Sequence, residues 1–454
     1  MRNLSIALAI GTTAAAAAFG QTASLGARVD SAVTALAGEG FSGVVRVESR
    51  GATILEKGYG LANRHAGTPF SPTTVVQIGS NTKDFTVVAL LQLYEQGRIG
   101  INDSLAKYFP SAPLDKRNIT VWQLVNHRAG FPLGLGGDFE PLDRAALVDQ
   151  AMKRPLSFPP ATRQSYSNTG YSLLAAIIEQ TTGRTYDEYV HDNILEPLGM
   201  TSTGLLLPQF DDRPLAHGYR AGVDDGTMLS RPHASDGSYW NLRGNGGMLS
   251  TVGDMHAFYT ALFTTNKLLK PETRKLRFDV NQPIGLAGSD LVCSFLYERD
   301  PVKAIEIIVA SNTSEWPERR VRSAIAAVMG LPSVDGPVTV GGAKANARLP
   351  NAAAAKLLNG FIEAVNSGDH STLSTFISAS FASDANSPTL ETRVERMLTM
   401  HGNLGRLTIV ALDQLEPELV EISLRTANEG PATIKAQIDA TAGKIRGIQV
   451  IVGG

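Results

Sequence analysis

The segment from Ser80 to Gln96 constrains the fold most, because its helical pattern is apolar on nearly every side. Its apolar residues are Phe85, Val87, Val88, Ala89, Leu90, Leu91, Leu93 and Tyr94, and Gly97 follows its end. A helix that is hydrophobic all round belongs in the interior of a domain. The chain therefore predicts a domain built around a central helix that begins at Ser80.

Strand patterns lie on both sides of the helical part of the chain. The first two, Gly43–Glu48 and Ala52–Lys57, read as a hairpin, and two more follow at Leu291–Leu296 and Ile305–Val309. The predicted helices are Arg28–Leu36, Val121–Asn126, Arg144–Met152, Thr169–Thr181 and Tyr186–Ile194. Strands, then helices, then strands predict an α+β domain whose sheet is built from both ends of the segment.

The 454 residues exceed what a single core usually holds, so two domains are expected. We place them at 21–333 and 348–454, with a linker rich in Gly, Ala and Val at 334–347. In the second domain, predicted helices at Ala352–Val365, Ser371–Ile377 and Glu391–His401 precede strands at Leu407–Leu415, Leu419–Leu424, Ala432–Ile438 and Ile445–Val452. This order predicts a small α+β module with one covered sheet face.

The first twenty residues have the pattern of a secretory signal peptide, 1–20. Arg2 is followed by an uncharged apolar stretch, Leu4–Ala18, and by small residues at Ala18 and Gly20. We therefore expect an exported protein, periplasmic or secreted, without a stable membrane span after cleavage. The alternative is a buried N-terminal helix or an uncleaved anchor.

Composition excludes several classes of protein. The net charge is −2, without a cluster of Lys and Arg, which disfavours nucleic-acid binding. The single cysteine, Cys293, excludes an intrachain disulfide; because it lies in an apolar run, we interpret it as a buried thiol rather than a nucleophile. The eight histidines show no ligand spacing, so we expect neither a metal site nor a cofactor.

The strongest candidate for chemistry is Ser80, with Lys83 one helical turn later. The free N–H groups of a helix start favour negative charge, and a desolvated lysine can lose its proton and act as a base. This S-x-x-K pattern is weak alone, since Ser104 and Lys107 repeat it in a polar, turn-like setting. The position of Ser80 at the start of the central helix distinguishes it.

Tyr166 and Asn168 form the second candidate feature, just before a predicted helix. A phenol is a poor base unless a nearby ammonium favours its phenolate, in which case it could take the serine proton. A carboxamide could orient the lysine or a substrate. Tyr239 and Asn241 fit the same Tyr-x-Asn pattern, and a turn with a buried aromatic is the structural alternative for either copy.

Five segments, in this order, carry a family resemblance: Gly79–Phe85, Asn126–Gly130, Tyr166–Asn168, Glu196–Met200 and Gly246–Met255. Residues 27–330 thereby resemble the serine β-lactamase-like superfamily of class C β-lactamases, penicillin-binding-protein-like proteins and family VIII esterases. The resemblance implies an α+β fold of the β-lactamase/transpeptidase-like kind, with an antiparallel sheet flanked by helices. It implies that Ser80 is acylated, that Lys83 and Tyr166 form the base system, that Asn168 binds Lys83 or substrate, and that the N–H of Ser80 stabilises the oxyanion.

The chain departs from the family at its third motif, where a Lys-Thr-Gly or His-x-Gly normally stands. Counting back from Asp300, the matching residues begin at Leu286 and end at Gly288. Gly288 allows close backbone approach, and the N–H of Ser289 could supply the second oxyanion donor. Leu286 removes a cation, which weighs against efficient β-lactam hydrolysis and suits neutral esters or amides. Compensating cations could come from loops: Arg231, Arg243, His217 or His233.

Three functional hypotheses follow. The first is an exported serine hydrolase, carboxylesterase or D-aminopeptidase/carboxypeptidase-like, acting on a small-molecule or peptide substrate through an acyl-enzyme. The second is a low-turnover penicillin-recognising protein, motivated by Leu286. The third is a non-catalytic binding protein that works through its C-terminal domain. Residues 361–369 of that domain resemble the start of an NTF2-like, cone-shaped module, which implies an accessory role or a homodimer.

Overall fold

The computed structural model of the chain describes residues 25–210, 213–220, 222–289, 292–313, 317–331, 352–382, 388–416, 419–426, 430–439 and 443–452. It divides into two compact units, Met1–Ala343 and Lys344–Gly454. The predicted signal peptide at 1–20 and the predicted linker at 334–347 lie outside the described residues. Of the helices described, none has the length and apolar character needed to cross a bilayer.

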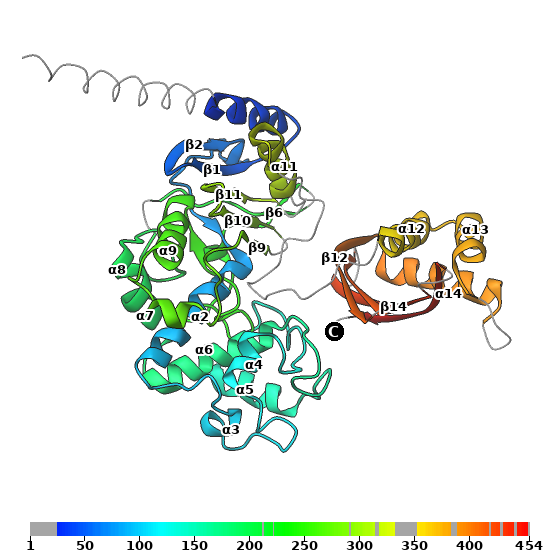
Figure 1. The fold of residues 1–454 in the computed structure, drawn as a ribbon, viewed down its shortest axis with the longest axis horizontal. Helices are drawn as coiled ribbons and strands as arrows, with labels where there is room; N and C mark the ends of the chain where they lie inside the picture. The colour runs from blue at the N-terminus through cyan, green and yellow to red at the C-terminus, as the bar shows by residue number, and fades with distance from the viewer. Residues whose placement is uncertain are drawn as a thin grey trace, which may run out of the picture. The chain divides into compact units, whose positions relative to one another are not determined.

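The first unit is organised around a five-stranded antiparallel sheet in the order β2-β1-β11-β10-β9 (Figure 1). Its strands are β1 Gly43–Ser49, β2 Ala52–Tyr59, β9 Ile284–Ser289, β10 Ser294–Asp300 and β11 Ile305–Ser311. Because β1 pairs with β11, the sheet joins the two ends of the segment, as the sequence predicted. Short paired strands lie outside it: β3 Leu61–Asn63, β4 Thr68–Pro69, β5 Val76–Gln77, β6 Tyr219–Arg220, β7 Val223–Asp224 and β8 Leu249–Ser250.

Successive side chains of β1 point to opposite faces of the sheet, and a hydrophobic core covers each face. Val45 and Val47 pack in a core with the N-terminal helix, residues 25–38, and with α11. Val44 belongs instead to the larger core that contains α2. Figure 1 shows α11 and the N-terminal helix on one side of the sheet and α9 on the other.

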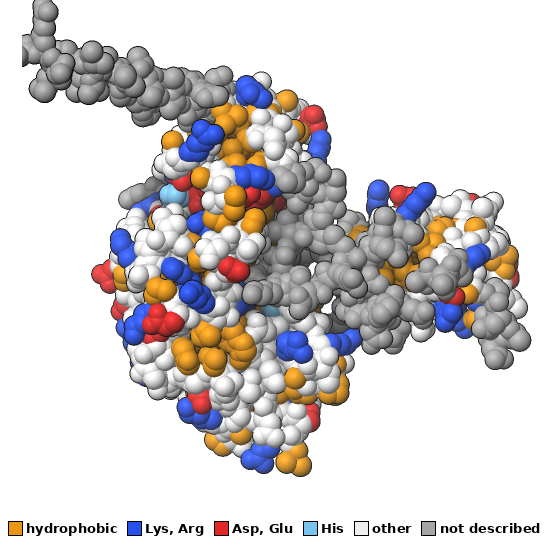
Figure 2. Space-filling model, viewed as in Figure 1, with side chains coloured by type: hydrophobic (Ala, Val, Ile, Leu, Met, Phe, Trp, Pro, Cys, Tyr) orange, Lys and Arg blue, Asp and Glu red, His pale blue; other side chains and the backbone are white. Residues whose placement is uncertain are grey.

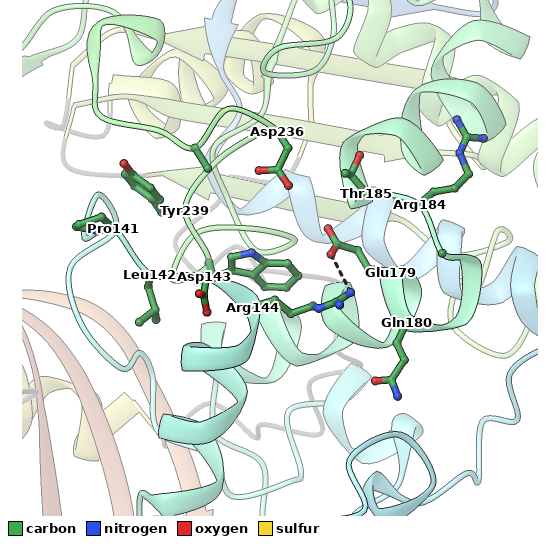
Figure 3. A pocket seen from close by; sticks show the side chains of 13 residues that line it. Pro141, Leu142, Asp143, Arg144, Glu179, Gln180, Arg184, Thr185, Asp236 and Tyr239 are labelled. Atoms are coloured by element: carbon green, nitrogen blue, oxygen red, sulfur yellow. Dashed lines mark hydrogen bonds and ion pairs between the residues drawn. The ribbon is translucent and has the colours of Figure 1, made fainter.

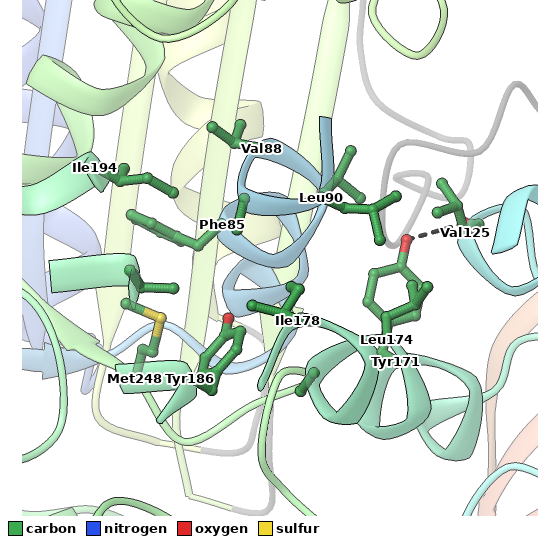
Figure 4. Packing of buried hydrophobic residues seen from close by; sticks show 14 of the residues in the cluster. Phe85, Val88, Leu90, Val125, Tyr171, Leu174, Ile178, Tyr186, Ile194 and Met248 are labelled. Atoms are coloured by element: carbon green, nitrogen blue, oxygen red, sulfur yellow. Dashed lines mark hydrogen bonds between the residues drawn. The ribbon is translucent and has the colours of Figure 1, made fainter. Parts of the chain in front are cut away.

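The central helix was predicted correctly. A short 3-10 turn, η1 Gly79–Asn81, leads directly into α2 Thr82–Glu95, and every residue of α2 from Thr82 to Leu91 is buried. Phe85 stacks on Phe258 of α9 with ring centroids 4.0 Å apart, and Figure 4 shows α2 surrounded by apolar side chains of the neighbouring helices. This burial fixes the helix start, and Ser80 with it, against the sheet.

The remaining helices of the first unit are α3 Leu105–Tyr108, α4 Val121–Val125, α5 Arg144–Lys153, α6 Asn168–Thr182, α7 Tyr186–Val190, η2 His191–Leu195, α8 Glu196–Leu198, η3 Met228–Ser230, α9 Val252–Thr264, α10 Pro271–Arg274 and α11 Pro317–Met329. Of these, α4, α5, α6 and α7 with η2 match predicted helices. The prediction of a strand at Leu291–Leu296 was wrong in its bounds: β10 begins at Ser294, and Leu291 lies outside the described residues. Cys293 is buried, as expected.

The second unit contains three helices and a four-stranded antiparallel sheet in the order β12-β13-β14-β15. Their bounds are α12 Ala352–Ser367, α13 His370–Ser380, α14 Leu390–Leu404, β12 Leu407–Glu416, β13 Leu419–Thr426, β14 Gly430–Asp439 and β15 Lys444–Val452. Val420, Ile422 and Leu424 share a core with residues of all three helices, so the predicted covered sheet face is confirmed. The resemblance to NTF2-like modules stays a prediction.

Charged side chains of both signs are interspersed on the face of the molecule shown in Figure 2. On the described part of that face, Lys and Arg side chains stand among Asp and Glu rather than in a continuous basic patch. On this face the distribution of the described charges is in keeping with the near-neutral net charge of −2.

Candidate active site

The candidate site is built at the start of α2, where Ser80 is half-buried and Lys83 is 1% exposed. Gly79 has a φ of +50°, in the left-handed region that favours glycine. A Cβ on Gly79 would lie 2.7 Å from the backbone N of Ser289. Glycine at this position therefore allows the end of β9 to lie directly against the turn that presents Ser80.

Lys83 contacts Ser80 from one helical turn away. Its Nζ lies 3.3 Å from the Oγ of Ser80 and donates a 2.7 Å hydrogen bond to the carbonyl oxygen of Asn245. The same Nζ lies 4.7 Å from the ring centroid of Tyr166 and 5.5 Å from that of Tyr171. The amine is thus enclosed by aromatic rings and directed at the serine hydroxyl.

Burial lowers the pKa of Lys83 to about 7, while the carboxylates of Asp138 and Asp84 act in the opposite direction. At neutral pH an amine with this pKa is unprotonated in a large share of the molecules. In these molecules it can accept a proton from Ser80 without a prior change of ionisation. A lysine with an ordinary pKa of 10.5 would be protonated and unable to do so.

Tyr166 reaches Ser80 from the loop before α6, and its hydroxyl donates a 2.7 Å hydrogen bond to the Oγ of Ser80. Desolvation raises the pKa of Tyr166 above its ordinary value, and the hydrogen bond with Ser80 only partly opposes this. The phenol is therefore neutral at physiological pH. This differs from the idea that an ammonium beside it makes Tyr166 a phenolate base, because burial raises the pKa of the phenol and the charge of Asp84 raises it further.

His127 packs against Tyr166. Its ring centroid lies 4.6 Å from that of Tyr166, and its Nδ1 accepts a 3.1 Å hydrogen bond from the backbone N–H of Ser167. Burial lowers the pKa of His127 well below 6.5, so the ring is neutral and adds no charge. The sequence singled out the segment that contains His127 but gave this residue no role.

Asn168 begins α6, and its backbone N–H donates a 2.7 Å hydrogen bond to the carbonyl oxygen of Leu133. Its side-chain Oδ1 is buried, with no hydrogen-bond donor among the described residues. The predicted bond from Lys83 to Asn168 is therefore absent from the described contacts; the carbonyl oxygen of Asn245 occupies that role. A backbone carbonyl has no sequence signature, so only the structure identifies this acceptor.

The end of β9 supplies the other wall of the site. A Cβ on Gly288 would collide with the carbonyl oxygen of Ile78 and lie 2.7 Å from the backbone N of Ser80. Gly288 and Ser289 thus lie beside the backbone N–H of Ser80, where two oxyanion donors would be needed. Leu286 is 2% exposed and belongs to the large core, so the position of the usual basic side chain is occupied by buried hydrocarbon.

Arg243 does not replace the missing cation. Its side chain is fully buried and forms ion pairs with Glu179 at 3.1 Å and Asp236 at 2.7 Å. Its guanidinium also lies 4.8 Å from the ring of Trp240. Arg243 is therefore a structural cation of the helical layer rather than a group that faces Ser80.

The other three candidate cations, Arg231, His217 and His233, also make contacts of their own. Their polar partners, in that order, are Asp225, Asp224 and the carbonyl oxygen of Ala234. None of the hydrogen bonds or ion pairs among the described residues joins these three to Ser80, Lys83 or Tyr166.

The two repeated motifs lie elsewhere. Lys107 is half exposed and forms an ion pair with Asp103 at 2.7 Å, and Ser104 precedes the short helix α3. Asn241 donates to the carbonyl oxygen of Gly137 at 3.0 Å. Tyr239 lines an open cavity of about 700 Å³ whose lining includes neither Ser80 nor Lys83 (Figure 3).

Among the described residues, two groups of side chains have the geometry to hold a cation: His191 with Asp192 and Glu196, and Glu48 with His256 and Glu306. The second group is assembled from segments far apart in the sequence. Ligand atoms of Glu48, His256 and Glu306 lie within 4.8 Å of one another. They come from β1, α9 and β11, which are distant in sequence. His256 lies 2.6 Å from Glu306 and 3.6 Å from Glu48, so the contacts of one histidine with two carboxylates account for this group.

Comparison with known proteins places this site in a family. The Beta-lactamase family model matches residues 29–286. Penicillin-binding protein 4* of Bacillus subtilis is 28% identical over 296 residues, which cover 61% of this chain and 63% of that protein. The putative penicillin-binding protein PbpX of the same species is 29% identical over 49% of this chain and 55% of its own length. The chain thus spans less than two thirds of these relatives.

Solved structures share the fold. The octameric penicillin-binding protein homologue from Pyrococcus abyssi matches 94% of this chain and 98% of its own, with a TM-score of 0.58 and 20% identity. The D-amino acid amidase from Ochrobactrum anthropi, complexed with D-phenylalanine, matches 68% of this chain and 99% of its own, with a TM-score of 0.55 and 20% identity. These two likenesses show the fold. Because the family model matches more than half of the chain, this protein belongs to the β-lactamase family, the serine β-lactamase and penicillin-binding-protein-like hydrolases.

Proposed function

We propose that this chain is a serine hydrolase that cleaves an ester or amide bond through an acyl-enzyme on Ser80. The observation that carries the proposal is the convergence of two side chains on one hydroxyl. The Nζ of Lys83 lies 3.3 Å from the Oγ of Ser80, and the hydroxyl of Tyr166 lies 2.7 Å from it. These distances suit proton transfer.

In the proposed mechanism, the unprotonated amine of Lys83 accepts the proton of Ser80, directly or with Tyr166 as relay. The Oγ then bonds to the substrate carbonyl carbon, and the N–H groups of Ser80 and Ser289 stabilise the resulting oxyanion. As the bond to the leaving group breaks, that group takes the proton from the Lys83–Tyr166 pair. Water then attacks the acyl-enzyme by the same sequence of proton transfers and releases the acid.

The character of Leu286 supports esters or amides over β-lactams. A buried leucine offers no charge to a substrate carboxylate, and it leaves the phenol of Tyr166 without an additional cation. One protein of similar structure is a D-amino acid amidase, which is consistent with an amide substrate. We further propose that the protein is exported, on the basis of its N-terminal sequence.

The test is hydrolysis of p-nitrophenyl acetate and of amino acid p-nitroanilides by the full chain and by Ser80→Ala. We expect repeated turnover by the wild type, and a loss of about 10³-fold or more in Ser80→Ala, as expected when a nucleophile is removed. Activity that persists in Ser80→Ala would remove the assignment.

The buried Leu286 favours one alternative, a low-turnover acyl acceptor. It predicts a burst of one p-nitrophenol per chain followed by negligible turnover. Steady-state turnover at many times the enzyme concentration excludes it.

A further inference from the structure

His127 holds the backbone on both sides of Tyr166. Its carbonyl oxygen accepts a 2.9 Å hydrogen bond from the backbone N–H of Ser165. Its ring Nδ1 accepts a 3.1 Å hydrogen bond from the backbone N–H of Ser167. The imidazole also packs against the ring of Tyr166, with the two centroids 4.6 Å apart. A single residue therefore contacts the tyrosine and both of its neighbours in the chain.

The backbone of His127 has a conformation that favours glycine. His127 follows Asn126, the C-cap of α4, and its φ is +56°. Its N–H donates a 3.1 Å hydrogen bond to the carbonyl oxygen of Leu124. Helices commonly end with a glycine in this left-handed conformation, and a residue with a Cβ is strained there. Termination of α4 therefore does not explain why this position holds a histidine.

Burial of the ring does not explain the histidine either. The side chain of His127 is 3% exposed, and its Nε2 is buried without a hydrogen-bond partner among the described residues. Because Nδ1 accepts the N–H of Ser167, the ring proton is on Nε2. A buried donor without an acceptor destabilises a fold. A strained residue with an unpaired donor is typical of a position that serves the reaction rather than stability.

The contact between Tyr166 and Ser80 depends on the loop that His127 holds. The hydroxyl of Tyr166 donates a 2.7 Å hydrogen bond to the Oγ of Ser80, and a displacement of about 1 Å in such a contact can slow a reaction about 10²-fold. Ser167 is 5% exposed, so without Nδ1 its backbone N–H would lose its acceptor inside the protein. Since buried N–H groups are nearly always paired, the loop would shift toward another acceptor.

We propose that His127 is a positioning residue, which holds the backbone on both sides of Tyr166 so that its hydroxyl meets the Oγ of Ser80. The inference rests on the proposed function of Ser80 and adds a residue that acts through the tyrosine. In this role His127 neither accepts nor releases a proton during the reaction. Its ring Nδ1 is an acceptor for one backbone N–H, and its ring supports the phenol.

The experiment compares two variants of nearly equal shape in the full chain, with p-nitrophenyl acetate as substrate. His127→Asn places an amide oxygen, also an acceptor, near the position of Nδ1 and tolerates the left-handed backbone. His127→Leu places a methyl group there. We expect kcat/KM to fall about 10²-fold in His127→Leu and to stay within about tenfold of the wild type in His127→Asn, which keeps the acceptor.

A third variant keeps the test independent of strain. His127→Gly suits the left-handed backbone but removes both the acceptor and the ring, so it should fold even where the leucine variant does not. We expect kcat/KM to fall about 10²-fold in this variant as well. Thermal unfolding followed by circular dichroism shows which variants are folded. Wild-type activity in folded His127→Gly would overturn the proposal.

A double-mutant cycle identifies the residue through which His127 acts. In a Tyr166→Phe background the hydroxyl is already absent, so His127→Gly should reduce kcat/KM by less than about twofold. A general distortion of the site would instead cause the same loss in both backgrounds. Asn126→Leu is the matched control, because it removes a 2.8 Å hydrogen bond to the carbonyl oxygen of Trp122 at the same helix end. It should leave kcat/KM within about twofold of the wild type.

Two results would overturn the role of His127 while leaving Ser80 as nucleophile. One is an equal loss in His127→Asn and His127→Leu, and the other is an undiminished loss in the Tyr166→Phe background. If the folded wild type cleaves neither p-nitrophenyl acetate nor amino acid p-nitroanilides, the proposed function fails, and the role of His127 fails with it.

Discussion

At the residue scale, the proposed reaction depends on the ionisation of one amine. Burial lowers the pKa of Lys83 to about 7, so the unprotonated fraction rises with pH up to that value and then levels off. We expect kcat/KM for a neutral ester to rise about tenfold per pH unit below 7 and to plateau above it. Lys83→Arg, whose guanidinium keeps its proton, should be about 10²- to 10⁴-fold slower at every pH. A wild-type profile without this acidic limb would contradict the role of Lys83.

The same shift predicts a stability effect with a definite sign. Between pH 7 and 10.5 the unfolded chain binds a proton on Lys83 that the folded chain does not, so stability rises with pH through that window. Lys83→Met should remove this slope and raise the melting temperature at pH 7, while activity is lost. Differential scanning calorimetry of both proteins at pH 7 and pH 9 measures it; a lower melting temperature for Lys83→Met at pH 7 would argue against a strained, desolvated amine.

Gly288 is the residue through which β9 approaches Ser80. In Gly288→Ala the new methyl group would collide with the carbonyl oxygen of Ile78, so strand and helix must separate. We expect kcat to fall about 10²- to 10³-fold, the effect of losing one oxyanion donor. Gly253→Ala is the matched control, because a Cβ there meets only the Oγ1 of Thr251 at 3.8 Å. Similar kcat values in both variants would contradict the oxyanion arrangement.

The sequence predicted which side chains take part in the proposed reaction, but it did not predict their hydrogen-bond acceptors or their protonation. Ser80, Lys83 and Tyr166 were identified from motifs, and the structure brings all three together. The carbonyl of Asn245 was missed because backbone acceptors look alike in a sequence. The neutral state of Tyr166 was missed because burial, which decides its pKa, depends on contacts with residues far along the chain.

At the element scale, the loop segment of residues 243–245 holds the helices α2 and α6 together through its backbone carbonyl groups. The carbonyl oxygens of Arg243, Gly244 and Asn245 accept hydrogen bonds from Ser172 of α6, Thr86 of α2 and Lys83 of α2. A Cβ on Gly244 would lie 2.7 Å from the Cβ of Ala175 and 3.0 Å from the carbonyl oxygen of Tyr171, so glycine permits this close contact. The segment couples the ion pairs of Arg243 to the position of the catalytic amine.

Arg243→Met tests this anchor. It leaves the buried carboxylate of Glu179 without its inner partner, so we expect a loss of about 3–5 kcal/mol in the free energy of unfolding. Arg144 pairs with the same Glu179 at 3.2 Å but is half exposed, and Arg144→Met should cost about 1 kcal/mol or less. Urea unfolding of both variants measures the difference. Equal losses in the free energy of unfolding would contradict a larger contribution from the buried ion pair.

Helices and strands were predicted correctly where the hydrophobic residues follow a single clear period. The uniformly apolar α2 and the alternating strand β13 were recognised because their periods are unambiguous. The helices α9 and α11 were missed, although Val321 and Ile325 recur at helical spacing and are fully buried, and although Thr251 caps the start of α9. The start of β10 was misplaced because the apolar run continues through Val292 and Cys293 before the ladder begins.

At the scale of the whole molecule, the two compact units have separate hydrophobic cores. Leu358 is fully buried in the core of the second unit, so Leu358→Ala should destabilise that unit by about 2–5 kcal/mol. If the second unit is an accessory module, one calorimetric transition should move to lower temperature while kcat/KM for a neutral ester stays within about twofold. A parallel loss of activity would show that the second unit contributes to the reaction centre. Homodimerisation through this unit stays a prediction, for sedimentation to examine.

The central claim is that the hydroxyl of Ser80 becomes acylated because Lys83 takes its proton. The most direct measurement is rapid-quench mass spectrometry of the full chain after mixing with a p-nitrophenyl ester, with peptide mapping of the adduct. We predict one acyl group per chain on the peptide that contains Ser80, formed faster at pH 8 than at pH 6 and nearly absent in Lys83→Met. An adduct on another residue, or undiminished acylation of Ser80 in Lys83→Met, would contradict it.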